Sequence, residues 1–332
     1  MNASIYRIGR SLVLTMCCVM PWLAPSVHAQ SAASDYPNRP IKIIVSHTPG
    51  GGVDSFARAI GQGLSERLGQ PVVIENKPGA SQTIGVAAAA KAPADGYTLF
   101  VGTQSGLVFN AIAFKKLPYD PVKDLTPVSM LFSSPFFLAV HPTVEAKSIT
   151  ELIALAKAKP GYYSVATIGE GTGSHLASVM FESRAKVEFL KVPYKGSAQA
   201  ITDLLGGTVH MMFEGGASVL PNVSQGKLRA FASTGSKRTE LMPNLPTLGE
   251  TFPGLALEVW WGMVAPAGVP KPIIDRLNQE IKQIQRTPKL QELAALFGGE
   301  IMESTPEQLG TRIHTELREF AKVMKEAGIE PK

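Results

Sequence analysis

The sequence contains only two cysteines, Cys17 and Cys18, and they stand side by side close to the N-terminus. Both fall within a leader that the chain is expected to lose on export. The rest of the chain then has no cysteine, which excludes disulfides, thiolate catalysis and thiolate metal ligands. We therefore expect a mature protein that is stable without covalent cross-links.

The leader lacks a hydrophobic run long enough to cross a membrane. Its apolar stretch, residues 11–24, is well short of the ~20 residues that a spanning helix needs. Arg7 and Arg10 precede this stretch and Val27-His28-Ala29 follows it. Positive residues, a short apolar core and a small-residue cleavage site are typical of a secretory signal peptide. We predict that residues 1–29 form such a peptide.

Strong charge of either sign is also missing. Lys and Arg number 32 against 27 Asp and Glu, and the formal charge of +5 falls to +3 when Arg7 and Arg10 leave with the signal peptide. No run of Lys or Arg exceeds two residues, and aromatic residues are not interleaved with basic ones, so we predict no nucleic-acid partner. The remaining ~300 residues of a chain that is 45% apolar suffice for two domains.

The sequence motifs of common enzymes are absent. The chain has no G-x-S-x-G turn, no H-E-x-x-H helix and no G-x4-G-K-[ST] phosphate loop, and its histidines show no metal-ligand spacing. A dinucleotide-dependent enzyme is the nearest alternative, because Gly169 and Gly171 follow a predicted strand. Ser174 stands where the third glycine belongs, and Glu188 begins rather than ends the next strand. We predict a non-enzymatic protein with no cofactor and no metal.

Strand-like and helix-like segments alternate along most of the chain, which is typical of an α/β fold with parallel strands. The predicted strands span residues 41–47, 72–75, 97–102, 164–168, 187–192, 209–213 and 228–233. The predicted helices span residues 54–68, 83–91, 149–158, 175–184, 198–205, 273–284, 289–296 and 306–327. We expect the last three helices to pack on the first domain.

Two longer extended runs, residues 128–140 and 255–264, are predicted to cross between two series of elements. The chain should therefore form one domain from residues 36–132 plus 258–332 and a second domain from residues 133–257. Two domains that are joined by two extended crossings open and close about a hinge.

Two glycine-rich turns each connect a predicted strand to a predicted helix, one over residues 49–54 and one over residues 169–175. Glycines let the backbone approach a ligand closely, and a helix start carries roughly half a positive charge. If the two turns face each other, they can hold the two ends of a small polyanion. The alternative is a pair of ordinary loops in which Asp54 and Ser174 cap their helices.

Short motifs throughout the chain carry a resemblance to a known family. They are Tyr36-Pro37 with Arg39-Pro40-Ile41, Pro49-Gly50-Gly51-Gly52 with Asp54, Glu75-Asn76-Lys77-Pro78-Gly79-Ala80, Asp95-Gly96-Tyr97-Thr98-Leu99, Tyr119-Asp120-Pro121, His175-Leu176, Val192-Pro193-Tyr194-Lys195-Gly196-Ser197, Asp203-Leu204-Leu205-Gly206-Gly207, Pro246-Thr247 and Ala265-Pro266-Ala267-Gly268. From about Tyr36 to its C-terminus the sequence resembles the periplasmic solute-binding proteins of tripartite tricarboxylate transporters, also called Bordetella uptake proteins. Each motif alone is weak, and together they are highly specific.

The resemblance implies a two-lobed, type II-like periplasmic binding protein, with a mixed, mostly parallel sheet flanked by helices in each lobe. It implies a monomer that captures a small organic carboxylate and delivers it to a permease made of one small and one large integral-membrane subunit. We expect a dicarboxylate, either aliphatic or aromatic. An alternative is a sensory role, in which the loaded protein docks on a sensor kinase.

Members of this family hold a ligand carboxylate near the two glycine turns, mainly through backbone groups and ordered water. Polar residues at other strand ends should select the distal end of the ligand. The predicted ligand-binding residues are Pro49, Gly50, Gly51, Gly52, Asp54, Ser81, Gln82, Thr103, Gln104, Ser105, Thr167, Gly169, Gly171, Thr172, Gly173, Ser174, His175, Glu214 and Gly215.

The sequence departs from the family pattern at three places that are expected to lie at such strand ends. They are His47-Thr48, Ser81-Gln82-Thr83 and Phe213-Glu214-Gly215-Gly216. Several of these residues also have structural alternatives. His175 can be structural or anchor a water, residues 103–105 can form a plain polar loop, and Glu214 can be a solvated loop carboxylate.

Three further residues carry predictions of their own. Trp260 and Trp261 should point to opposite faces of a strand, so that at most one of them lines a pocket. Lys195 fits a strand end and turn better than a direct contact with the ligand.

Overall fold

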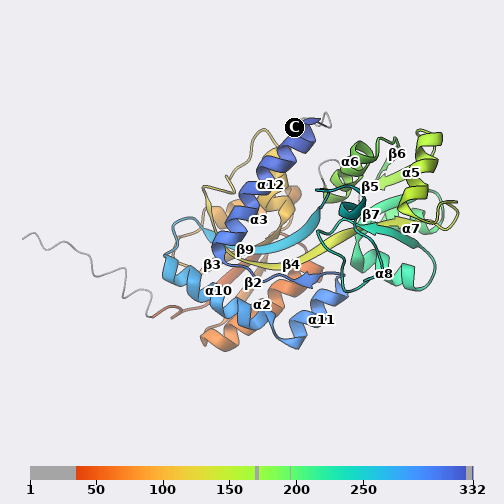
Figure 1. Cartoon of the computed structure of the whole chain (residues 1–332). Helices are drawn as coiled ribbons and strands as arrows, with labels where there is room; N and C mark the ends of the chain where they lie inside the picture. The colour runs from red at the N-terminus through yellow and green to blue at the C-terminus, as the bar shows by residue number, and fades with distance from the viewer. Residues whose placement is uncertain (1–34, 169–171, 195, 327–330, 332) are drawn as a thin grey trace, which may run out of the picture.

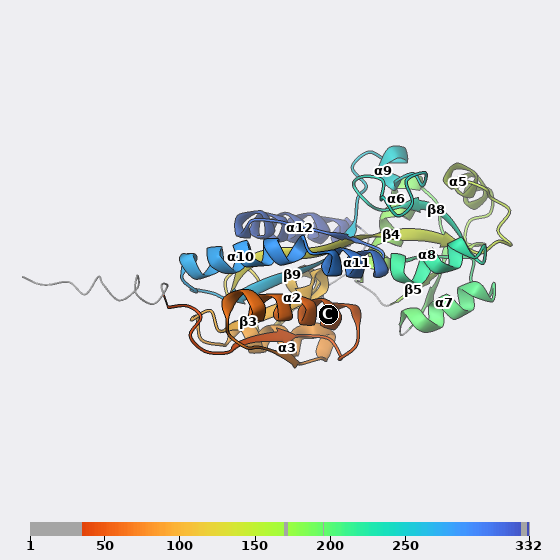
Figure 2. The same ribbon diagram turned by 90° about the horizontal axis from the view of Figure 1, so that it is seen from below.

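The computed structural model describes residues 35–168, 172–194, 196–326 and 331. Its helices and strands form two lobes that lie side by side, and two long strands run through both (Figure 1). Figure 2 shows the same two groups of elements from below. This arrangement is the predicted two-lobed α/β fold.

The first lobe is built around three parallel strands, β1 (Ile41–Val45), β2 (Val72–Asn76) and β3 (Thr98–Thr103), in the order β2-β1-β3. Its longer helices are α2 (Gly52–Leu68), α3 (Thr83–Ala90), α10 (Lys271–Gln285), α11 (Pro288–Leu296) and α12 (Pro306–Glu326). The three C-terminal helices contact this lobe, as predicted: the apolar faces of α10 and α11 pack on one face of the sheet, and that of α12 packs on the other.

The second lobe repeats the pattern with parallel strands β5 (Ser164–Thr167), β6 (Leu190–Pro193) and β7 (Met211–Gly215), in the order β7-β5-β6. Strand β8 (Arg229–Ser233) pairs with a crossing strand instead. The helices of this lobe are α5 (Ile149–Ala158), α6 (Gly173–Ala185), α7 (Ser197–Leu205), α8 (Gly216–Ser224) and the short α9 (Leu248–Thr251).

The two crossing strands are β4 (Leu125–Val140) and β9 (Glu258–Pro266). They pair antiparallel to each other, and β9 also pairs with β3 of the first lobe. The second half of β4 pairs with β7 and β8 of the second lobe. The predicted extended crossings are therefore confirmed, and they merge the described strands into one continuous sheet.

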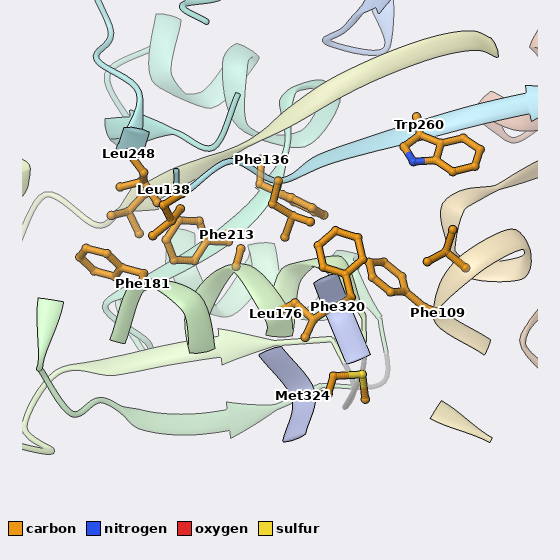
Figure 3. Packing of buried hydrophobic residues seen from close by; sticks show 14 of the residues in the cluster. Phe109, Phe136, Leu138, Leu176, Phe181, Phe213, Leu248, Trp260, Phe320 and Met324 are labelled. Carbon is orange, nitrogen blue, oxygen red and sulfur yellow. The ribbon is translucent and has the colours of Figure 1, made fainter. Parts of the chain in front are cut away.

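The hydrophobic core fills both faces of this sheet. The cluster on one face continues from the first lobe into the second, and Phe109, Leu176, Phe320 and Met324 lie together where the lobes meet (Figure 3). The rings of Phe109 and Phe320 are 5.1 Å apart between centroids. The end of α12 therefore joins the apolar contact between the two lobes.

Trp260 belongs to this shared cluster, whereas Trp261 belongs to the cluster on the opposite face, where it stacks on Phe132. The prediction of opposite faces is confirmed, because successive side chains alternate across a strand. Both indoles are buried, with 0% and 9% of their surface exposed.

The sequence analysis did not predict α8. This helix contains Gly216 and Pro221, which both weaken a helix. Burial of Val219 in the core of the second lobe offsets this low propensity. The short strand β10 (Glu300–Ile301), the π-helical turn Ser105–Phe109 and α4 (Asn110–Ala113) were also missed. No helix within the described residues is both long and apolar enough to cross a membrane.

Candidate functional site

The parallel strands of both lobes end near the middle of the crossing strands. Thr103 at the end of β3 pairs with Trp261, and Gly215 at the end of β7 pairs with Phe136. Because β3 and β7 approach these positions from different lobes, the turns that follow their carboxyl ends lie between the lobes. Ligands of open α/β sheets bind at such edges.

A hydrogen-bond network joins the turns that follow β1, β2 and β3 in the first lobe. The Gln82 amide Nε2 donates to Thr103 Oγ1 at 2.7 Å, and Ser46 Oγ donates to Gln82 Oε1 at 3.0 Å. The Ser105 N–H donates to the same threonine oxygen at 3.3 Å. The structure thus brings together Gln82, Thr103 and Ser105 from separate parts of the chain. Because Ser105 begins a helical turn, the plain-loop alternative for residues 103–105 is wrong.

The backbone at Ala80, Ser81 and Gln82 is left-handed, with φ values of 45°, 51° and 75°. Left-handed geometry costs a non-glycine residue about 1–2 kcal/mol. The turn is held by Asn110, whose side-chain amide donates to the Ser81 carbonyl at 2.7 Å. Backbone strain of this kind concentrates at binding sites, and here it presents an exposed Ser81 at the start of α3.

Asp54 does not cap α2, contrary to the alternative reading. Gly51 is the N-cap, and the Asp54 carboxylate accepts hydrogen bonds from the Gly50 N–H, Arg58 Nε and Asn76 Nδ2 at 2.8–2.9 Å. Burial alone raises the pKa of Asp54, but these hydrogen bonds hold it below its usual value. The carboxylate is therefore committed to the chain itself, where it fixes the turn around Gly50.

We expect Asp54→Asn to destabilise the protein by about 1–3 kcal/mol at pH 7, since the amide nitrogen replaces one carboxylate oxygen and cannot accept the hydrogen bonds made to it, either those from Gly50 and Arg58 or the one from Asn76. Because the folded-state pKa lies below the unfolded value of about 3.9, this contribution is fully present above about pH 5 and disappears as the pH falls through the folded-state pKa. Urea unfolding of wild type and Asp54→Asn at pH 7 and at pH 3 measures the difference in free energy of unfolding at each pH. Equal midpoints for wild type and variant at pH 7 would contradict this role.

The Gln104 side chain points away from the other predicted residues of the first lobe. It is 1% exposed, and its Nε2 donates to Glu316 Oε2 on α12 at 2.7 Å. Glu316 also accepts from Trp260 Nε1, and its burial raises its pKa. Gln104 therefore anchors α12, a role that the local sequence did not indicate.

In the second lobe, Thr172 rather than Ser174 caps α6, because the Thr172 hydroxyl accepts from the His175 N–H at 3.3 Å. The Ser174 hydroxyl is 1% exposed and donates to the Phe213 carbonyl at 2.6 Å. His175 and Thr167 are buried beside these elements. Gly169, Gly171 and Lys195, which were also part of the predictions, lie outside the described residues.

The glycines at these strand ends serve two purposes. A Cβ on Gly52 would lie 2.9 Å from the Trp261 ring, and one on Gly173 would lie 2.5 Å from the Phe136 ring. These two glycines are needed for close packing on the crossing strands. A Cβ on Gly50 or Gly215 would meet nothing within 4 Å, so these positions border open space.

Four helix starts at these strand ends have no side-chain cap among the described residues. The N-cap residues are Gly51 for α2, Gln82 for α3, Gly196 for α7 and Gly215 for α8. The Thr83 N–H of α3 donates to the Ala80 carbonyl, but no described side chain caps the first backbone N–H groups of these helices, and the helix dipole favours an anion there. Each lobe thus offers uncapped donors beside the region where the lobes meet.

Glu214 is 9% exposed at the end of β7, which rules out the alternative of a solvated loop carboxylate. Ser197 Oγ donates to its Oε2 at 3.0 Å. Burial raises the pKa of Glu214, although hydrogen bonds from the Gly215 N–H and from Ser197 act in the opposite direction.

Comparison with known proteins decides the family. The model of the tripartite tricarboxylate transporter family receptor matches residues 56–329. The chain belongs to this family. As such a receptor it is a periplasmic binding protein and not an enzyme, so the dinucleotide alternative falls. Cleavage of the signal peptide stays a prediction, since residues 1–29 lie outside the described part of the chain.

Relatives of this tripartite tricarboxylate receptor support the assignment. The chain is 36% identical to protein BugT of Bordetella pertussis over 304 residues, and this match covers 91% of this chain and 93% of BugT. It is 33% identical to an R. palustris protein solved with adipate, with a TM-score of 0.77 over 90% of this chain and 100% of that one. MatC of Rhodopseudomonas palustris with bound malate shares 29% identity and a TM-score of 0.71, covering 87% and 99%.

Proposed function

We propose that this receptor captures a small organic dicarboxylate, aliphatic or aromatic, between its lobes and delivers it to a tripartite tricarboxylate-type permease. The observation that carries the proposal is the set of uncapped helix starts, present on both lobes, beside the middle of the crossing strands. Carboxylates are the ligands that such donors favour. Two relatives of known structure are described with adipate and malate, which are both dicarboxylates.

The proposed site combines Gly50, Gly51 and the turn of residues 80–82 on the first lobe with residues 172–175 and 214–215 on the second. The proposed rigid units are residues 36–132 with 258–332 and residues 133–257. One lobe binds the ligand first, and the second lobe adds contacts only when the hinge closes. Because of these added contacts the ligand binds the closed state more tightly than the open state, which shifts the population toward the closed state.

A screen of mono-, di- and tricarboxylates by thermal shift tests the proposal most directly. A dicarboxylate at 100 times its dissociation constant is expected to add about 2.7 kcal/mol to the free energy of unfolding. Calorimetric titration of the best compound then gives the affinity. A melting temperature that responds only to neutral sugars or to cationic amino compounds would remove the carboxylate assignment.

Delivery to a permease can be separated from sensing by deleting the genes of the two membrane subunits. Uptake of the ligand is then expected to stop, because the receptor alone cannot move a solute across a membrane. Unchanged uptake would remove the transport role, and a transcriptional response to the ligand that persists without the permease would favour docking on a sensor kinase instead.

A further inference from the structure

Glu214 is a buried carboxylate at the edge of the proposed ligand site, although the proposed ligand is itself negatively charged. It is the last residue but one of β7, and its register partner on β4 is Phe137. The start of α8 follows it directly, and the start of α7 supplies Ser197, whose hydroxyl lies 3.0 Å from Oε2. Glu214 therefore lies between two uncapped helix starts.

No cation in the described part of the chain neutralises this carboxylate. Among residues 35–168, 172–194 and 196–326, no Lys or Arg side chain forms an ion pair with Glu214. Its partners are the hydroxyl of Ser197 and the backbone N–H of Gly215. A carboxylate has room for about four hydrogen bonds, so acceptor capacity remains. A Cβ built on Gly196 or Gly215 meets nothing within 4 Å, so open space lies beside the glycines that adjoin Ser197 and Glu214 in the chain.

The charge of Glu214 changes what this corner of the site can accept. A ligand carboxylate placed directly against it would be repelled. A hydroxyl or ammonium group of the ligand would donate to the free acceptor positions, while the carboxylates of the ligand take the backbone donors at Gly51 and at the other helix starts.

We propose that Glu214 is a specificity-determining residue that selects dicarboxylates carrying a hydroxyl or ammonium substituent over the unsubstituted parent acids. The inference rests on the proposed function and names its ligand class more closely. A hydrogen bond to a charged group corresponds to a preference of roughly ten- to a hundredfold in dissociation constant.

Matched ligand pairs test this preference in the full-length mature protein. Succinate is compared with malate and aspartate, and adipate with 2-aminoadipate, by calorimetric titration. Wild type is expected to bind at least one substituted acid ten times more tightly than its parent. If each parent binds within twofold of its substituted partners, the inference is wrong although the proposed function stands. If no dicarboxylate binds, neither these acids nor any aliphatic or aromatic diacid of the thermal-shift screen, the proposed function itself fails.

Variants then assign the preference to Glu214. Glu214→Gln removes the charge and should weaken the preference for ammonium-substituted acids, while Glu214→Leu should abolish the preference for both substituents. The control is Glu292→Gln, which changes an exposed carboxylate on α11 and should leave every ratio unchanged. Thermal melts identify any variant that fails to fold. A folded Glu214→Leu protein that retains the wild-type ratio overturns the inference.

Discussion

Gly51→Asp is expected to abolish carboxylate binding while leaving the protein folded. Gly51 is the N-cap of α2, with φ −78° and ψ 172°, a conformation that any residue can adopt. A Cβ there would lie 3.7 Å from the Thr48 carbonyl oxygen, which is an ordinary contact. The new carboxylate can accept from the first N–H groups of α2, as aspartate does at other helix N-caps. It would therefore occupy the donors that we assign to the ligand.

The expected size of the effect follows from the charge. Two like charges about 4 Å apart repel by about 4 kcal/mol at an effective dielectric constant of 20, which corresponds to roughly a thousandfold loss of affinity. The free energy of unfolding should stay constant or rise slightly, since aspartate is a favourable N-cap. Calorimetric titration and thermal melts measure the two quantities on the same sample.

Two further substitutions at Gly51 separate charge from occupation of the donors. Gly51→Ala leaves the N–H groups free and should change affinity least, whereas Gly51→Asn occupies them without adding charge and should be intermediate. The predicted order of affinity is alanine, then asparagine, then aspartate. If the aspartate variant binds as tightly as the alanine variant, the start of α2 is not part of the ligand site.

The second large effect is expected at Gly216, where the two lobes touch backbone to backbone. A Cβ on Gly216 would lie 2.7 Å from the carbonyl oxygen and 2.8 Å from the Cα of Gly298. Gly298 cannot retreat easily, because its φ is +71° and Ser134 Oγ donates to its carbonyl at 2.6 Å. A groove of about 510 Å³ between α8 and α11 borders this contact.

Gly216→Ala must therefore move one lobe away from the other or strain the contact. Overpacking of this kind costs about 1–3 kcal/mol, which urea unfolding measures. If the lobes separate instead, small-angle scattering should show a larger radius of gyration. The control for unfolding is Gly215→Ala, since a Cβ at the preceding residue meets nothing within 4 Å. Identical stability and scattering for the two variants would show that the Gly216 contact does not set the relation between the lobes.

Most of the secondary structure could be predicted because local patterns dominate it. Helix α5 was predicted with its observed bounds, Ile149–Ala158, since Ser148 caps it and Pro160 follows its end. Strand β6 begins at Leu190, three residues later than predicted, because its length is set by pairing with β5. Helix α8 was missed because packing against the core outweighs its poor propensity.

The candidate site also contains some features that local sequence predicted and others that it could not predict. The turn at residues 49–54 was recognisable from its glycines. Gln82 and Thr103 were each predicted as ligand-binding residues, but the hydrogen bond between them was not predicted. Whether Gly52 serves a ligand or the packing on Trp261 could not be read locally, because the indole comes from a strand about 200 residues later.

The sequence by itself determined the family, the alternation of strands and helices, and the two crossing runs, because hydrophobic period and turn chemistry act over a few residues. Only the tertiary structure decided that Gln104 anchors α12 through Glu316, that Thr172 rather than Ser174 caps α6, and that Glu214 is buried. These roles depend on which side chains meet after the two lobes assemble, and contacts between distant segments leave no local pattern in the chain.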